Sequence, residues 1–176
     1  CTGRSINSHN NTIMSETKII LDACCGSRMF WFDKHNPNTL FIDKRSETVT
    51  AKDRDKIRTI EVKPDIVADF TNLPFEDNSF YMGVFDPPHL KTLGETSWMA
   101  KKYGKLPTNW QEVIKTGFDE CMRVLKPNGT LIFKWNESEI KAVEILSLIP
   151  YEPLFGHTTG RQSKTIWMCF MKLPTD

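Results

Sequence analysis

Short apolar runs alternate with polar or helix-periodic segments along the chain from residue 18 onward. The runs are rich in Ile, Val, Leu and Phe, and helical patterns separate several of them. This alternation predicts an α/β domain with a mainly parallel sheet. The predicted strands are KIILDA (residues 18–23), TLFID (39–43), DIVADF (65–70), YMGVFD (81–86), TLIFKW (130–135) and KTIWMCFM (164–171).

Two amphipathic helices are predicted in the second half of the chain. Over residues 109–125, apolar residues recur at three- and four-residue steps and form one face. A second helix is expected after Asn136 and should end at Pro150. Both helices should cover the sheet, so their apolar residues are assigned to the core rather than to a ligand site.

The size and charge of the chain narrow the choice of function. With 176 residues, 39% of them hydrophobic, the chain suits one well-buried domain and is too short for a second recognition domain. We expect a single domain over residues 15–176, preceded by a flexible leader at residues 1–14. The formal net charge of +1 indicates no polyanionic partner by itself, so any basic surface must be local.

Cysteine and histidine usage argues against a disulfide framework or a metal site. The five cysteines are odd in number and lack Cys-x-x-Cys spacing, and the four histidines are scattered along the chain. No apolar run reaches the length of a membrane span, and no signal-peptide pattern is present. These features predict a cytoplasmic protein that binds neither a metal nor a membrane.

Four of the predicted strands end in or beside an aspartate, namely Asp22, Asp43, Asp69 and Asp86. A single acid at a strand end usually belongs to a turn or a cap. Ligands of open parallel sheets lie beyond the carboxyl ends of the strands. The repetition therefore predicts one crevice that all four acids share.

The first predicted strand runs into LDACCGSR (residues 21–28), which combines a turn at Gly26 with an apparent helix start. Glycine lets the backbone approach a ligand closely, and a helix N-terminus favours a carboxylate or phosphate. The G-x-G-x-x-G fingerprint is absent, so pyrophosphate binding is not supported.

Asp43 follows Asp22 by 21 residues, at the end of the next predicted strand. An acid at this place commonly accepts hydrogen bonds from ribose hydroxyls. An adenosine-containing cofactor without a pyrophosphate fits this spacing and the loop. Lys44 and Arg45 leave open a 2′-phosphate and a reduced nicotinamide cofactor.

The segment VFDPPHL (residues 84–90) ends an apolar run in an acid followed by two prolines. Proline fixes its own backbone and keeps the preceding residue extended, so Asp86 and Pro87 form a rigid acceptor platform at a strand end. A rigid turn without chemistry is the competing interpretation.

Together these segments resemble class I S-adenosylmethionine-dependent methyltransferases over residues 18–172. LDACCGSR is similar to the D-P-F-x-G-S-G loop of amino-methyltransferases, ADFTNLPFEDNSF resembles the adenine-binding segment, and RVLKPNGTLIF resembles the fifth strand with its preceding turn. DPPH resembles the D/N-P-P-Y/F/W motif of enzymes that methylate exocyclic or amide nitrogens. The resemblance implies a Rossmann-like fold with a twisted, mainly parallel sheet, an antiparallel C-terminal strand and helices on both faces.

The same resemblance implies S-adenosylmethionine as the cofactor. It assigns the methionine end of the cofactor to Asp22 and Gly26, with Cys24 between them, and the ribose to Asp43. It assigns the adenine to Asp69 and the Phe70 backbone, and it places Asp86 at the catalytic side of the cofactor site. Cys24 and Arg28 stand where the family's loop has glycines.

In the catalytic motif, the resemblance implies that Asp86 and the Pro87 carbonyl accept the two hydrogens of an amino group. The nitrogen lone pair is then directed at the methyl group, so catalysis is mainly positioning. Pro88 adds stiffness, and His89, in place of a larger aromatic residue, would stack on the acceptor plane. The favoured acceptor is a nucleic-acid base of the N6-adenine or N4-cytosine type.

Other acceptors remain open at this point. Lys134 in FKWNE, together with Asp86, resembles part of the Lys-Asp-Lys-Glu set of 2′-O-ribose RNA methyltransferases. A protein amide and a small molecule are further alternatives. A non-catalytic adenosyl-binding module is disfavoured by the intact Asp-Pro-Pro.

After His89, residues 90–107 interleave lysines with aromatic residues. Lys101, Lys102 and Trp98 are candidate substrate-binding residues, because lysines follow a phosphate backbone and aromatic rings stack on bases. Lys91, Tyr103 and Lys105 belong to the same segment. An ordinary solvated loop is an equally good interpretation.

Overall fold

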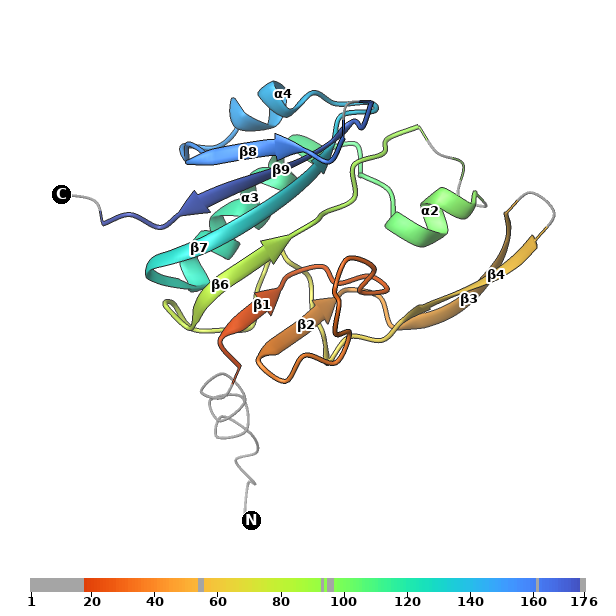
Figure 1. Cartoon of the computed structure of the whole chain (residues 1–176), viewed down its shortest axis with the longest axis horizontal. Coiled ribbons are helices and arrows are strands. Elements are labelled where there is room, and N and C mark those ends of the chain that lie inside the picture. The colour runs from red at the N-terminus through yellow and green to blue at the C-terminus, as the bar shows by residue number, and fades with distance from the viewer. Residues whose placement is uncertain (1–17, 54–55, 93, 95–96, 161, 175–176) are drawn as a thin grey trace, which may run out of the picture.

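The computed structural model describes residues 18–53, 56–92, 94, 97–160 and 162–174, so the expected leader at residues 1–14 lies outside the described part. A seven-stranded sheet forms the centre of the molecule (Figure 1), in the order β5-β2-β1-β6-β7-β9-β8. The strands are β1 (Ile20–Asp22), β2 (Thr39–Asp43), β5 (Ile66–Val67), β6 (Phe80–Phe85), β7 (Leu125–Asn136), β8 (Phe155–Thr158) and β9 (Thr165–Met171).

The sheet has the expected mixture of directions. β5, β2, β1, β6 and β7 pair in parallel, whereas β9 pairs antiparallel with both β7 and β8. The prediction of a mainly parallel sheet with an antiparallel C-terminal strand is therefore confirmed. Because parallel strands point the same way, the carboxyl ends of β1, β2 and β6 meet at one edge of the sheet.

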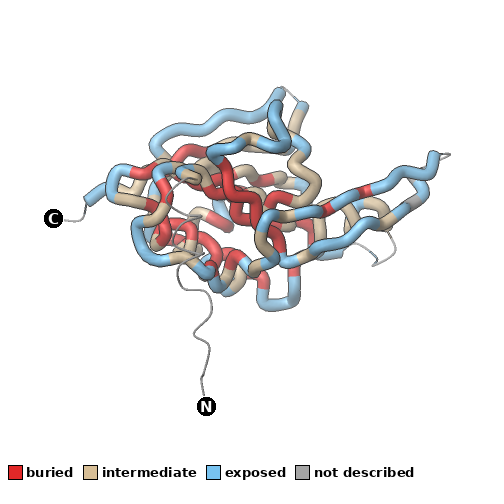
Figure 2. The backbone as a smooth tube through the Cα atoms, turned by 90° about the horizontal axis from the view of Figure 1, so that it is seen from below, coloured by how far each residue is buried: buried red, intermediate tan, exposed pale blue. Residues whose placement is uncertain are grey.

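The helix α3 (Trp110–Val124) covers one face of the sheet, against β6 and β7, and confirms the stronger of the two helix predictions. Its Phe118 ring lies 5.5 Å from the Phe133 ring and 4.8 Å from the Phe170 ring, measured between centroids. The buried residues gather in the interior between these elements (Figure 2). Aromatic packing of this kind forms the main core.

The second predicted helix is shorter than expected. The helix α4 (Ala142–Leu146) buries Ala142 and Ile145 in the same core as α3. At its end, the Ser147 hydroxyl donates a hydrogen bond to the Glu144 carbonyl at 2.7 Å. A serine that bonds to the backbone in this way competes with continuation of the helix, and turns follow.

Turns replace the helix that was expected after Gly26. The whole β1–β2 connection, residues 23–38, is without α-helix, and Gly26 and Arg28 adopt left-handed φ values of 49° and 53°. Asp33 and Asn36 each accept a hydrogen bond from the backbone two residues on, at 2.9 and 3.0 Å. These local side-chain contacts favour turns over a helix.

Aromatic residues of the β1–β2 connection cover the face of the sheet opposite α3. Phe30 packs edge-on against Trp167 of β9 at 5.3 Å, and Trp31 packs against Phe41 of β2 at 5.1 Å. Side chains alternate along a strand, so Trp167 lies on the other face from its neighbour Phe170 three residues on. The helices α3 and α4 therefore lie on one face, and a turn-rich segment replaces the expected helix cover on the other.

A β-hairpin that the sequence analysis did not predict projects from the body of the protein beside α2 (Trp98–Tyr103) (Figure 1). It consists of β3 (Glu47–Asp53) and β4 (Lys56–Val62), which pair antiparallel. In β4 only Ile60 and Val62 are buried. Both faces of the hairpin are exposed to solvent along much of its length, which is consistent with its mostly polar sequence.

Gly117 of α3 fits against two aromatic rings and generates a stability prediction. A Cβ at this position would lie 2.4 Å from Phe70 Cδ2 and 2.9 Å from Phe85 Cζ. The variant Gly117→Ala should therefore lose about 1–3 kcal/mol of unfolding free energy, the usual cost of overpacking a core. Urea denaturation measures this loss.

The matched control is Gly160→Ala, because a Cβ at Gly160 meets nothing within 4 Å. Equal denaturation midpoints for the two variants would contradict the packing described for α3.

Candidate active site at the carboxyl ends of the strands

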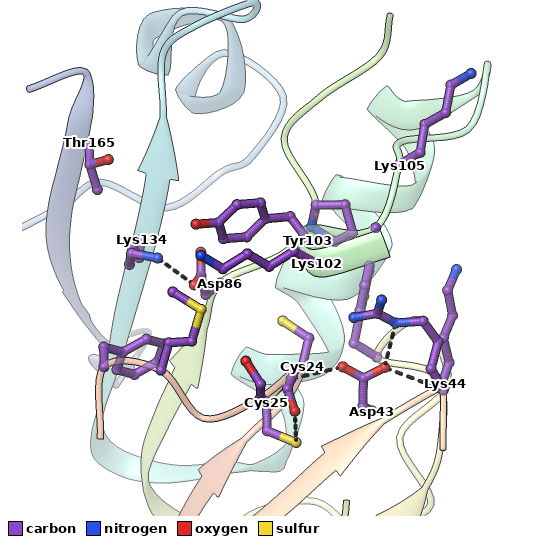
Figure 3. A pocket seen from close by; sticks show the side chains of 18 of the residues that line it. Cys24, Cys25, Asp43, Lys44, Asp86, Lys102, Tyr103, Lys105, Lys134 and Thr165 are labelled. Carbon is purple, nitrogen blue, oxygen red and sulfur yellow. Dashed lines mark hydrogen bonds and ion pairs between the residues drawn. The ribbon is translucent and has the colours of Figure 1, made fainter. Parts of the chain in front are cut away.

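A cavity of about 360 Å³ opens at the carboxyl ends of β1, β2 and β6 (Figure 3). Its walls come from the loop after β1, the end of β2, the segment between Asp86 and Lys105, and strands β7 and β9. The lining residues are Cys24, Cys25, Gly26, Ser27, Met29, Phe30, Asp43, Lys44, Arg45, Phe70, Asp86, Pro88, Lys102, Tyr103, Gly104, Lys105, Lys134, Thr159, Thr165 and Trp167.

Asp43 is the most connected acid of the cavity and is 5% exposed. Its Oδ2 accepts a hydrogen bond from the Gly26 N–H at 2.9 Å. Its Oδ1 accepts from the Arg45 backbone N–H at 2.9 Å and from Arg45 Nε at 3.3 Å. A carboxylate offers about four acceptor positions, so Asp43 retains capacity for a ligand hydroxyl.

Asp22 lies beneath the cavity and does not belong to its lining. Its carboxylate has no exposed surface and accepts hydrogen bonds from Trp31 Nε1 at 2.7 Å and the Cys24 N–H at 3.3 Å. Burial raises the pKa of Asp22 to about 7, against the lowering effect of these two hydrogen bonds. Asp22 thus holds the loop that carries Gly26.

Asp69 is exposed and also lies outside the lining. Its Oδ1 accepts hydrogen bonds from the Thr71 backbone N–H at 2.9 Å and the Thr71 hydroxyl at 2.8 Å, which close a turn. Phe70, the next residue, does line the cavity. The expectation of one crevice lined by four acids is corrected: Asp43 and Asp86 reach it, whereas Asp22 and Asp69 shape the segments around it.

Cys24 and Cys25 line the cavity beside Gly26 as free thiols. Burial raises the pKa of the Cys24 thiol well above its usual value and that of Cys25 to about 12. Nucleophilic chemistry requires a thiolate. Both side chains are therefore neutral walls of the cavity rather than reacting groups.

Asp86 and Lys134 form an ion pair at the other end of the cavity (Figure 3). Lys134 Nζ lies 2.5 Å from Asp86 Oδ2. Burial raises the pKa of Asp86, and the Lys134 charge acts in the opposite direction. The Lys134 ammonium also lies 5.3 Å from the Phe30 ring centroid and 5.6 Å from that of Trp167, within cation–π range.

The residues after Asp86 separate into lining and core. Pro88 lines the cavity, whereas Pro87 is buried and His89 is only 9% exposed. The His89 ring packs 5.6 Å from the Tyr103 ring and borders a smaller cavity of about 100 Å³. The aromatic ring of this region that faces the main cavity is therefore that of Tyr103.

Of the candidate substrate residues in the lysine-rich segment, some line the cavity and others lie outside it. Lys102 and Lys105 line the cavity. Lys101 instead donates to the Thr50 carbonyl of β3 at 3.4 Å, and its own carbonyl accepts from Arg45 Nη1 at 3.0 Å. Trp98 is outside the cavity lining, on the side of α2 near the hairpin.

Several lining residues were not identified from the sequence, and Phe30, Thr165 and Trp167 are the main ones. Phe30 belongs to the aromatic run FWF (residues 30–32), which is an unusual composition for a turn-rich connection. Thr165 and Trp167 are two residues apart on β9, so both side chains lie on the same face of the sheet, opposite the core. The aromatic run could have indicated a buried or ligand-binding role for Phe30, but the sequence gives no indication that Phe30 packs against Trp167 of β9.

Within residues 18–53, 56–92, 94, 97–160 and 162–174, no group of three or more His, Cys, Asp or Glu side chains is arranged to hold a metal ion. No helix in this same part of the chain combines the length and apolar character needed to cross a membrane.

Known structures resemble this fold, although neither a protein-family model nor a curated protein sequence matches the chain. An S-adenosylmethionine-dependent methyltransferase from Methanosarcina mazei has a TM-score of 0.54 and 14% identity, over 96% of this chain and 98% of that one. An rRNA methylase from Streptococcus thermophilus has a TM-score of 0.52 and 12% identity, over 98% and 100% of the two chains.

A geranyl diphosphate methyltransferase in complex with GPP and sinefungin is similar as well, with a TM-score of 0.51 and 8% identity over 94% of this chain and 77% of that one. At these identities the likeness concerns the fold. The chain has the Rossmann-like fold of S-adenosylmethionine-dependent methyltransferases, which confirms the predicted fold class.

The buried position of His89 generates a prediction for its protonation. Burial, with the nearby Lys134 charge, lowers the pKa of His89 to about 4. Between about pH 4 and the usual value of 6.5, the unfolded chain therefore binds a proton at His89 that the folded protein does not. Stability from this group should rise with pH across that window, and His89→Gln should remove this part of the rise.

An NMR titration tests the assignment directly. The imidazole signal that disappears in His89→Gln should titrate near pH 4. A midpoint near pH 6.5 would mean that the ring is exposed to solvent.

Proposed function

We propose that this chain is an S-adenosylmethionine-dependent methyltransferase that methylates an exocyclic or amide nitrogen. The favoured acceptor is a nucleic-acid base of the N6-adenine or N4-cytosine type. The observation that carries the proposal is that one cavity brings Asp43, bonded to Gly26, together with the Asp86-Pro87-Pro88 segment. The fold shared with known methyltransferases supports it.

The residues at the β1–β2 end of the cavity fit the cofactor. Asp43 retains acceptor capacity for a ribose hydroxyl. Gly26 has a left-handed φ of 49° and open space at its Cβ position, so its backbone can approach a ligand. Phe70 and Phe30 add apolar walls. When bound, S-adenosylmethionine supplies a methyl group activated by a positively charged sulfur.

The Asp86 end of the cavity fits the acceptor nitrogen. An amino group conjugated to a ring is a poor nucleophile because its lone pair is delocalised. Asp86 Oδ1 and the Pro87 carbonyl would accept its two hydrogens and direct the lone pair at the methyl group. As the new nitrogen–carbon bond forms and the carbon–sulfur bond breaks, the nitrogen releases one proton, for which Asp86 is a nearby base.

Tyr103 takes the stacking role that the resemblance gave to His89. The Tyr103 ring borders both the main cavity and the smaller cavity, whereas His89 is enclosed against Tyr103 and Trp135. A planar acceptor stacked on Tyr103 would present its edge to Asp86. This arrangement favours a flat, aromatic acceptor over a flexible amine.

The ion pair between Lys134 and Asp86 favours a second candidate, a 2′-oxygen of RNA ribose. A ribose hydroxyl must lose its proton to become a good nucleophile. A lysine held at the reacting oxygen by an acid can stabilise the resulting negative charge. Lys134 Nζ lies 2.5 Å from Asp86 Oδ2, and its positive charge would stabilise the ribose oxygen as it loses its proton.

Transfer of a labelled methyl group tests the proposal. The protein is incubated with tritiated S-adenosylmethionine and separate pools of DNA, RNA, protein and small metabolites, and the labelled product is identified by mass spectrometry. Label on N6 of adenine or N4 of cytosine is the expected result. Label on a ribose oxygen would establish the second candidate, and label only in protein or metabolites would exclude a nucleic-acid acceptor.

Variants of the ion pair distinguish the two candidates. Asp86→Ala should abolish transfer under both, with cofactor affinity largely retained because Asp86 acts on the acceptor. Under the nitrogen mechanism, Lys134→Ala removes the charge that lowers the Asp86 pKa, so the acid limb of the pH–rate profile should move to higher pH with activity recovered there.

Under the ribose mechanism, Lys134→Ala should be inactive at every pH. The control is Lys115→Ala on α3, which pairs with Asp119 far from the cavity and should retain the wild-type profile. Near-native turnover by Asp86→Ala would contradict both mechanisms and favour a rigid turn without chemistry.

A further inference from the structure

A second and larger cavity, of about 620 Å³, lies between the β1–β2 connection, the hairpin and α2. The two cavities share the lining residues Gly26, Ser27, Met29 and Lys102. The larger cavity, which we call the hairpin groove, is therefore continuous with the candidate active site. The methyl-transfer mechanism described above uses none of its other residues.

The hairpin groove carries an excess of positive charge. Its lining includes the cations Arg28, Lys34, Arg58, Lys63 and Lys102 but only the carboxylates Glu61 and Asp65. The net charge of the whole chain is +1, so this concentration is local. A groove lined mainly by one sign of charge attracts ligands of the opposite sign.

The carboxylates of the groove already have partners. Asp65 lies 2.8 Å from Lys18 Nζ and 3.1 Å from Arg28 Nη2, and Glu61 pairs with Lys63. Within the described residues, the ammonium groups of Lys34 and Lys102 make no ion pair. These two lysines remain as positive charges that an anionic ligand can neutralise.

Trp98 gives the groove an aromatic surface next to these charges. Its side chain is only partly buried and lines the groove. The Lys102 ammonium and the Arg58 guanidinium each lie 5.9 Å from the Trp98 ring centroid. Cations interleaved with an exposed aromatic ring are the surface on which single-stranded nucleic acids bind, through phosphate contacts and base stacking.

We propose that the hairpin groove binds a single strand of nucleic acid and leads its target nucleotide past Lys102 into the active site. The proposal rests on the proposed function, whose acceptor class it refines. Phosphates contact Lys34 and Lys102, and one base stacks on Trp98. The recognition surface thus consists of the hairpin, which is inserted between β2 and β5, and of α2, which follows β6.

The position of α2 agrees with this arrangement. Lys101 joins α2 to β3 through the Thr50 carbonyl, and Arg45 joins α2 to Asp43. The helix that carries Trp98 and Lys102 is therefore bonded on one side to the hairpin and on the other to the proposed cofactor site. A strand in the groove would lie at a defined distance from the reacting atoms.

Fluorescence anisotropy with short labelled DNA and RNA oligonucleotides tests the inference, with single strands and duplexes as separate arms. The wild-type protein should bind single strands of at least one type more tightly than the matching duplex. Lys34→Ala should weaken binding and reduce the slope of log affinity against log salt by about 0.7, the value for one phosphate of a single strand.

Trp98→Ala should weaken binding about 5- to 150-fold, as expected for the loss of one stacked base, with the salt slope unchanged. Trp98→Phe should restore most of the affinity because it keeps a flat aromatic face. Lys115→Ala on α3 is the matched lysine control and should bind as the wild type does. Circular dichroism melting curves of all variants exclude unfolding as the cause of any loss.

The outcomes separate this inference from the proposed function. If the wild type transfers methyl groups to nucleic acid but Lys34→Ala and Trp98→Ala bind as tightly as the wild type, the groove inference is wrong and the proposed function stands. Binding that depends on these residues without any transfer would support the groove and contradict the proposed acceptor. A preference for duplexes, or displacement by inorganic phosphate at equal concentration of phosphate groups, would overturn the inference.

Discussion

The carboxylate of Asp43 joins three parts of the molecule that are far apart in the sequence. It accepts hydrogen bonds from Gly26 in the β1–β2 connection and from Arg45 after β2, and Arg45 in turn donates to the Lys101 carbonyl in α2. Asp43 is almost completely buried, and a buried charge without partners costs free energy, so these hydrogen bonds are needed to stabilise the carboxylate. The shape of the cavity, its shared wall with the hairpin groove and the place of α2 all depend on this one acid.

Around Asp43, the acids and bases of the site are balanced by burial and pairing. Asp22 lies under the loop with its pKa raised to about 7, and Asp86 lies beside Lys134. His89, near the same lysine, is held neutral by burial with a pKa of about 4. The cavity thus has one end with a hydrogen-bonded acid for a cofactor and another with an ion-paired acid for an acceptor.

Much of the fold follows from the sequence pattern. Strands β1, β2, β6, β7 and β9 and the helix α3 coincide with apolar runs or helical periodicity, because each is buried by its neighbours. The hairpin of β3 and β4 escaped prediction because it is solvated along much of both faces and contains no continuous apolar run. The turns after Gly26 escaped it because the left-handed φ of Arg28 and the packing of Phe30 on Trp167 depend on contacts with distant strands.

The site was predictable to a similar degree. Asp43 and Asp86 were expected at the cavity, and both line it. That Asp22 bonds to Trp31 beneath the floor, or that Asp69 bonds to Thr71 outside it, depends on side-chain directions that strand-end spacing does not specify. The contact joins Lys134 of β7 to Asp86, the residue that follows the adjacent parallel strand β6, and the motif comparison suggested it only as part of an alternative chemistry.

Isothermal titration of the protein with S-adenosylmethionine and with its demethylated product tests the central role of Asp43 most directly. Both ligands should bind, and Asp43→Ala should weaken both strongly. Asp119→Ala removes a partly exposed acid on α3 that pairs with Lys115, and it should leave both affinities unchanged. Tight binding of NADP with no response to S-adenosylmethionine would contradict this account, as would wild-type affinity in a folded Asp43→Ala variant.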